Sequence, residues 1–149
     1  MWMLVRANAL GADEAEGDNT KVLAACPDSS ERGDPWRWTV TLDESSSELG
    51  VGVVADREHI SVSTTRLQNK PATVLRRAAG AQLVIAALEG ETLVSAESGP
   101  WKRWLRPGDV FIIEGEETES VNLFMADTDT SVEAISLSST TSRALRWVP

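Results

Sequence analysis

The stretch "LRPGDVFIIEGEETESVNLF", residues 105–124, carries the strongest fold signal in the sequence. Within "RPGD", the Pro107 ring fixes φ for the first corner of a turn, and Gly108 accepts the positive φ of the second corner. The apolar run Val110–Ile113 follows this turn directly. After a second, polar turn, Ser120–Met125 alternates between polar and apolar residues as a half-buried strand does. The stretch therefore predicts antiparallel strands joined by tight turns.

The rest of the chain repeats this pattern of short strand-like segments separated by Gly, Pro, Asp, Asn and Ser. No window of about a dozen residues sustains the apolar spacing of a helix. Two polar segments, 11–20 and 26–35, have little to bury and are predicted to be loosely ordered, with only the short apolar patch Val22–Ala25 between them. The predicted strands are Met3–Arg6, Trp36–Leu42, Val51–Val54, His59–Leu67, Thr73–Arg76, Gln82–Leu88, Thr92–Ala96, Trp101–Leu105, Val110–Ile113, Ser120–Met125, Val132–Leu137 and Ala144–Val148. The sequence is therefore predicted to be all-β, with very little helix.

Length and charge limit the domain count and the partners. A chain of 149 residues is the usual size of one domain. Its formal net charge of −9, from 23 acidic and 14 basic residues, argues against nucleic acid or an anionic membrane surface as a partner, because both would repel it. Its apolar runs are far shorter than the roughly 20 residues of a membrane-spanning helix. We therefore expect one domain that binds neither nucleic acid nor membrane.

The compartment is predicted from the N-terminal segment and from cysteine usage. The start "MWMLVRANALGADEAEG" has no basic region before its apolar stretch and carries acidic residues soon after it, unlike a secretory signal. Cys26 is the single cysteine, so it has no partner for an internal disulfide and no set of companions for a metal. Both features indicate a cytoplasmic protein.

The turns between residues 82 and 125 carry a resemblance to a known superfamily. The segment "LEGE" (88–91), followed by "LRPGDVFII" (105–113), resembles the core of the RmlC-like cupin superfamily. This resemblance implies a cupin-like β-barrel, or jelly roll, of antiparallel strands. We expect a single domain over 1–149, in which N-terminal strands within 1–42 pack on a barrel core at about 51–137.

A second resemblance is to the HutD/Ves family of metal-free cupin-like proteins. The blocks that carry it are "MWMLVRA" (1–7), "GDNTKVLA" (17–24), "PWRWTVTLDE" (35–44), "LVIAALEGE" (83–91) and "SVNLFM" (120–125). The chain departs from that family in its Gly-rich block, where only Gly17 and Thr20 fit, and at Val22, where the family has an acidic residue. The resemblance implies a role linked to amino-acid catabolism, specifically to the use of histidine.

The residue types that a metal cupin uses are missing here. Such a protein supplies two His and a Glu from its first motif and another His from its second, because several N and O ligands must converge on one ion. The first-motif region contains no His, and the whole chain contains only His59. In the second motif Glu114 stands where Pro is usual, and Thr118 or Glu119 stands where His is expected. We therefore predict no metal and no other cofactor.

Strand alternation gives two interpretations of the barrel interior. In the first, Thr118, Ser120 and Asn122 line a polar lumen, as the cupin pattern implies. In the second, the opposite face of the same strand, which carries Val121, Leu123 and Met125, fills a packed core. One arginine of the pair at 76–77 points to each side of its strand, so one of them could hold a carboxylate at the barrel mouth. The predicted ligand-binding residues are Arg76, Gln82, Glu114, Thr118 and Asn122.

These observations favour binding over catalysis. The main hypothesis is a metal-independent cupin-like protein that binds a small, polar, anionic metabolite in its barrel, as a sensor or accessory protein. No catalytic residue is assigned, because no pair of titratable groups stands at a suggestive spacing. One alternative is a structural or oligomer-forming module with a filled barrel, which could be a homodimer. The other is a metal-free epimerase or lyase with Glu114 or His59 as its base.

Overall fold

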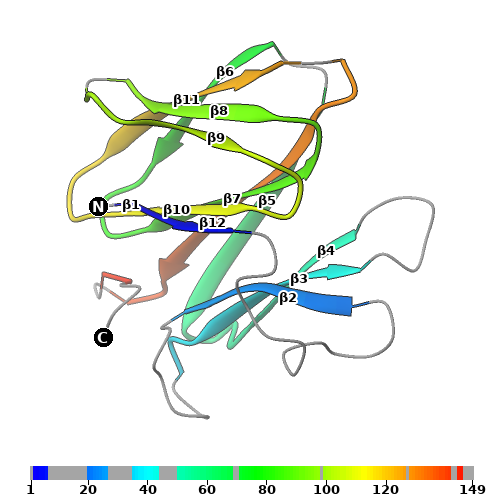
Figure 1. Cartoon of the computed structure of the whole chain (residues 1–149). Helices are drawn as coiled ribbons and strands as arrows, with labels where there is room; N and C mark the ends of the chain where they lie inside the picture. The colour runs from blue at the N-terminus through cyan, green and yellow to red at the C-terminus, as the bar shows by residue number, and fades with distance from the viewer. Residues whose placement is uncertain are drawn as a thin grey trace.

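A computed structural model describes residues 2–6, 20–26, 35–43, 50–68, 71–97, 99–126, 128–141 and 144–145, and its regular elements are all β-strands (Figure 1). The strands are β1 (Trp2–Val5), β2 (Thr20–Cys26), β3 (Trp38–Asp43), β4 (Gly50–Ala55), β5 (Ile60–Gln68), β6 (Ala72–Arg77), β7 (Gln82–Glu89), β8 (Thr92–Ala96), β9 (Lys102–Leu105), β10 (Val110–Glu114), β11 (Glu119–Met125) and β12 (Ser131–Ser139). Within the described residues there is no helix with the length and apolar character needed to cross a membrane.

The eight strands from β5 to β12 form a jelly roll. They lie in two antiparallel sheets, with the strand orders β10-β7-β12-β5 and β6-β11-β8-β9, and the chain crosses between the sheets after every strand except β8, which is followed by its neighbour β9. Interleaving of this kind is the double Greek key that jelly rolls and cupins share. The prediction of an all-β, cupin-like jelly roll is therefore confirmed.

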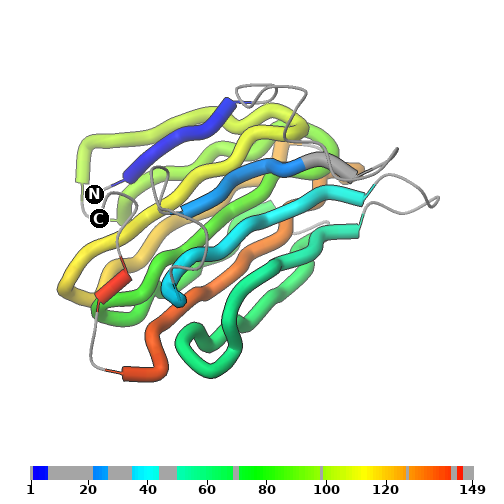
Figure 2. The backbone as a smooth tube through the Cα atoms, turned by 90° about the horizontal axis from the view of Figure 1, so that it is seen from below, coloured from blue at the N-terminus to red at the C-terminus, as the bar shows by residue number. Residues whose placement is uncertain are grey.

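The N-terminal strands widen the jelly roll and add a third layer. β1 pairs with the free edge of β10, so the first sheet becomes five-stranded. β2, β3 and β4 form a separate sheet, the N-terminal sheet, which packs on the outer face of the five-stranded sheet through a shared apolar cluster. Figure 1 shows the three layers in succession, and Figure 2 shows the strands of the N-terminal sheet running in nearly the same direction as those they cover. The five-stranded sheet is therefore the middle layer.

Apolar side chains fill the space between the two sheets of the jelly roll. Val121, Leu123 and Met125 point into it from β11, and all three are buried. They meet Phe111, whose ring lies 5.4 Å from that of Trp2, centroid to centroid. The packed-core interpretation of this strand is therefore the one that the structure supports, and the face that carries Asn122 points away from the interior.

The turn at 106–109 has the predicted geometry. Gly108 has a φ of 92°, and its N–H donates to the carbonyl of Ala87 at 2.8 Å. The Asp109 carboxylate is buried, and its Oδ2 accepts from the backbone N–H of Arg106 at 2.9 Å and from the Arg6 guanidinium at 2.7 Å. The turn therefore also anchors the residue that follows β1.

Two segments differ from the prediction. The patch Val22–Ala25 is the middle of a full strand, β2, which pairs with β3 and carries an irregularity between Val22 and Ala24. The sequence did not predict this strand, because its flanking segments are polar and its pairing with β3 depends on residues elsewhere in the chain. At the other end, Ala144 and Leu145 are not in a strand, although the Leu145 N–H donates to the Gly80 carbonyl at 3.0 Å. The rest of the predicted last strand, and most of the segments 11–20 and 26–35, lie outside the described residues.

We predict that Gly108→Ala destabilises the protein by about 1–2 kcal/mol, because an L side chain is strained at this positive φ. Chemical denaturation monitored by tryptophan fluorescence measures the change. Gly50→Ala is the control, since its added methyl group meets nothing closer than 3.8 Å. Equal effects of the two substitutions would contradict the assignment of the turn.

Candidate functional site

The five predicted binding residues do not converge in the barrel. Arg76 and Thr118 are exposed, and Asn122 is half-buried on the outer face of β11. Gln82 and Glu114, by contrast, are buried and hydrogen-bonded to each other. The structure therefore pairs two of the five residues directly and leaves the other three out of that pair.

Gln82 and Glu114 form a polar pair in the middle layer. They are register partners on β7 and β10, and Gln82 Nε2 donates to Glu114 Oε2 at 2.8 Å. They face the N-terminal sheet rather than the jelly-roll interior: the Trp38 indole N–H donates to Gln82 Oε1 at 2.8 Å, and Cys26 Sγ lies 3.3 Å from Gln82 Nε2. The pair therefore connects two layers across an otherwise apolar contact.

These polar groups make that contact specific. A buried amide or carboxylate costs free energy unless its hydrogen bonds are made, so Gln82 favours the arrangement that places Trp38 and Glu114 within reach. Trp38 is fully buried, and its ring belongs to the apolar cluster between the layers. The pair is thus a connection between sheets, built from two of the predicted residues.

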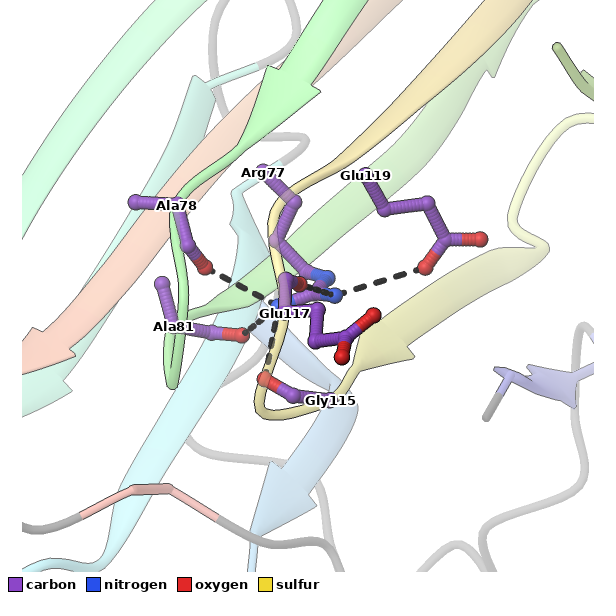
Figure 3. A network of polar contacts seen from close by, with 6 residues as sticks. All are labelled: Arg77, Ala78, Ala81, Gly115, Glu117 and Glu119. Carbon is purple, nitrogen blue, oxygen red and sulfur yellow. Dashed lines mark hydrogen bonds and ion pairs between the residues drawn. The ribbon is translucent and has the colours of Figure 1, made fainter.

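The buried arginine of the 76–77 pair is Arg77, at the end of β6. Its guanidinium is enclosed by two turns, 78–81 and 115–119 (Figure 3). Nη1 donates to the carbonyls of Ala78 at 2.9 Å, Gly115 at 2.8 Å and Ala81 at 3.3 Å. Nη2 donates to the carbonyl of Glu117 at 2.5 Å. We call the segments 77–82 and 114–119, which Arg77 holds together, the polar end.

One edge of this guanidinium is incompletely paired. Nη2 lies 3.4 Å from Oε2 of Glu119, and the neighbouring Nε is buried without a hydrogen-bond partner. A buried N–H without a partner costs roughly 1–3 kcal/mol. Such a group in a native structure calls for an explanation, and a functional one is a bound acceptor.

A glycine makes this arrangement possible. A Cβ atom on Gly115 would lie 2.9 Å from Nη2 of Arg77, closer than carbon and nitrogen can pack. The two turns also meet directly, because the Gly80 N–H donates to the Gly115 carbonyl at 2.9 Å. The polar end is therefore a rigid unit whose shape depends on a side chain being absent at residue 115.

The sequence led to the selection of Arg76 rather than Arg77, because it did not show which residues of this strand face the interior. Leu75 packs on the jelly-roll interior, so Arg77, two residues later, shares its face. Val74 and Arg76 lie on the other face and are exposed. Because Val74 and Leu75 are both apolar, the sequence alone did not reveal which of them was inside.

The single histidine belongs to a turn outside the polar end. His59 Nδ1 lies 2.9 Å from Asp56 Oδ2, and the Glu58 N–H donates to Asp56 Oδ1 at 3.0 Å. The bond from Glu58, together with the contact with His59, lowers the pKa of Asp56 below its usual 3.8. Ligand atoms of these three residues lie within 4.8 Å of one another, but the hydrogen bonds of the turn already account for that closeness.

Comparisons with known proteins bear on the fold. No family model matches the chain, and no curated protein matches it. Among solved structures, the chain is similar to PA5104 of Pseudomonas aeruginosa PAO1, a conserved protein of unknown function. The TM-score is 0.67 at 11% identity, over 95% of this chain and 100% of that one. The chain has a cupin-type jelly-roll fold.

Two further solved structures are more distant. KdgF from Halomonas sp. has a TM-score of 0.41 at 13% identity, over 75% of this chain and 86% of that one. A putative ethanolamine utilization protein, EutQ, from Salmonella typhimurium LT2 has a TM-score of 0.35 at 18% identity, over 70% of each chain. At these identities the comparisons concern architecture, so any function has to be argued from the residues of this chain.

We predict that Gly115→Ala lowers the free energy of unfolding by about 1–3 kcal/mol, because the added methyl group displaces Arg77 from the carbonyls it satisfies. Urea denaturation of the wild type and the variant measures this loss. The same substitution in an Arg77→Met background should cost much less, since the group it collides with is gone. Equal costs in both backgrounds would show that Arg77 is not the cause.

Proposed function

We propose that this protein is a metal-independent binding protein for a small carboxylate-bearing metabolite, held by Arg77 at the polar end. The single observation that carries the proposal is the buried Nε of Arg77, which has no hydrogen-bond partner. The resemblance to the HutD/Ves family supports an amino acid or a close derivative as the ligand, and a sensor or accessory role in amino-acid catabolism. Cys26 is buried and is the single cysteine of the sequence, so it has no second cysteine to pair with, which is consistent with a cytoplasmic setting.

The geometry of a guanidinium favours this ligand. Its Nε–H and one Nη2–H point the same way along one edge, so a carboxylate placed there accepts two parallel hydrogen bonds. Glu119 lies nearest this edge, but its contact of 3.4 Å involves Nη2 alone. The Glu119 side chain is 31% exposed, so it can turn into water. A ligand carboxylate would take the place that Glu119 leaves.

The surrounding charge narrows the ligand class. Glu116 and Glu117 are exposed in the turn that encloses Arg77, and they repel a simple anion. A molecule that carries an ammonium or N–H group beside its carboxylate avoids that repulsion, because the acidic turn can accept its hydrogen bonds. Free amino acids have this character.

A structural role is the second candidate, and the filled jelly-roll interior favours it. The space where many barrels hold ligands is occupied by side chains: Leu83, Ile85 and Ile113, together with the face of β11 that carries Leu123. For this reason the proposed ligand sits at the polar end and not among those side chains. If no ligand binds there, the structural role is the better account.

The test is a thermal-shift and NMR titration of the full chain, treated with a chelator, against acetate, free amino acids and N-acyl amino acids. We expect at least one of these carboxylates to raise Tm in a concentration-dependent way and to shift amide signals of residues 77–82 and 114–119. Arg77→Lys should weaken binding at least tenfold, because Lys cannot form the bidentate pair. The matched control, Arg76→Lys, should bind as the wild type does.

A second variant keeps the proposal testable if Arg77→Lys does not fold. Glu119→Gln removes the charge of the internal competitor and keeps its shape, so it should bind the carboxylate more tightly than the wild type. No shift with any of the probes, or an equal loss in Arg76→Lys, would overturn the proposal. A shift that appears only after a divalent metal is restored would overturn its metal-independent part.

A further inference from the structure

The outer face of the four-stranded sheet displays large apolar side chains to solvent. Four large hydrophobic residues are exposed in the described part of the chain, and three of them lie on this face: Val74 (59% exposed), Phe124 (48%) and Trp104 (46%). Figure 1 shows this sheet, β6-β11-β8-β9, as the outermost layer on the side away from the N-terminal sheet. Exposed apolar groups that gather on one face indicate an interaction surface.

Strand register aligns two of these residues, Phe124 and Trp104. Phe124 on β11 is the partner of Ala72 on β6 and of Leu93 on β8, and Leu93 is in turn the partner of Trp104 on β9. The four side chains therefore form one row across all four strands, which we call the apolar row. Trp and Phe are the residue types enriched at the centres of protein interfaces.

A charged pair lies at the other end of the same face. Arg76 on β6 is the partner of Ser120 on β11. On the opposite side of Ser120, Glu97 directly follows the last residue of β8, and its N–H donates to the Ser120 carbonyl at 3.3 Å. Arg76 and Glu97 are both exposed. One row of the sheet thus carries a positive charge on one side of Ser120 and a negative charge on the other.

From this pattern we infer that the face binds a second copy of the chain. A two-fold axis that runs parallel to the strands, between two sheets packed face to face, superimposes each cross-strand row on the same row of the other copy. The apolar row then meets its own counterpart. In the charged row, Arg76 of one copy lies opposite Glu97 of the partner subunit, because the rotation exchanges the two sides of the sheet. The face is therefore complementary to itself.

The local charge of this face, unlike the overall charge of the chain, is compatible with this occupant. Two chains of net charge −9 repel each other over most of their surfaces. The apolar row carries no charge, and Arg76 and Glu97 have opposite charges. The row between these rows carries the exposed Lys102, so this face lacks the excess of negative charge that the chain has overall. Homodimerisation through this face is independent of any ligand at the polar end.

The experiment measures the mass of the full chain by sedimentation velocity over a wide concentration range. We expect a monomer–dimer equilibrium in the wild type, and at least a tenfold weaker association in Trp104→Glu and in Phe124→Glu. Val54→Glu is the control, because Val54 is 62% exposed but lies on β4 of the N-terminal sheet. It should associate as the wild type does.

Charge reversal tests the symmetry itself. Arg76→Glu and Glu97→Arg should each weaken the dimer, because each places like charges opposite each other. The double variant should restore association, since it exchanges the two signs. A wild type that stays monomeric at every concentration would overturn the inference. So would a dimer that Val54→Glu disrupts as strongly as Trp104→Glu, or one that tolerates both single charge reversals.

Discussion

Burial of β7 and β10, two inner strands of the five-stranded sheet, on both faces is the constraint on which the rest of the structure depends. Val84 and Ile112 pack against the N-terminal sheet, while Leu83 and Phe111, their sequence neighbours, pack into the jelly roll. β7 and β10 are therefore apolar at almost every position, because no face of theirs is available to water. The two outer sheets each bury a single face, so polar residues lie mainly on the outer layers, on the exposed edge strand β5 and at the ends of β7 and β10.

At the ends of β7 and β10, buried polar groups find hydrogen-bond partners. There the chain turns, and the carbonyls of Ala78 and Gly115, which already accept from backbone N–H groups, also accept from one cation, Arg77. The same turns place Gln82 beside Glu114, the terminal pair of the ladder between β7 and β10. The Arg77 guanidinium has a structural role, because it stabilises two turns. Its Nε, which has no hydrogen-bond partner, is the atom on which the proposed binding role depends.

Local chemistry in the sequence was enough to predict the fold. The turn at Pro107 and Gly108 needs no tertiary information, and the alternation of Val121 with Asn122 defines a strand by itself. The faces were harder, because both faces of β7 are apolar and the sequence gives no reason to direct Gln82 toward the N-terminal sheet. Likewise β2 is a strand only because β3 pairs with it, which is information held elsewhere in the chain.

The place of β12 in its sheet has a consequence for biosynthesis. β5, the first strand of the jelly roll, has β12, the last, as its partner, and β12 also pairs along β7. During synthesis the ribosome releases β5 and β7 well before Ser131–Ser139, so both strands wait with open hydrogen-bonding edges. Cooperative closure of the jelly roll is therefore expected late in translation, and the nascent chain is most vulnerable to aggregation or to chaperone capture in the interval before β12 emerges.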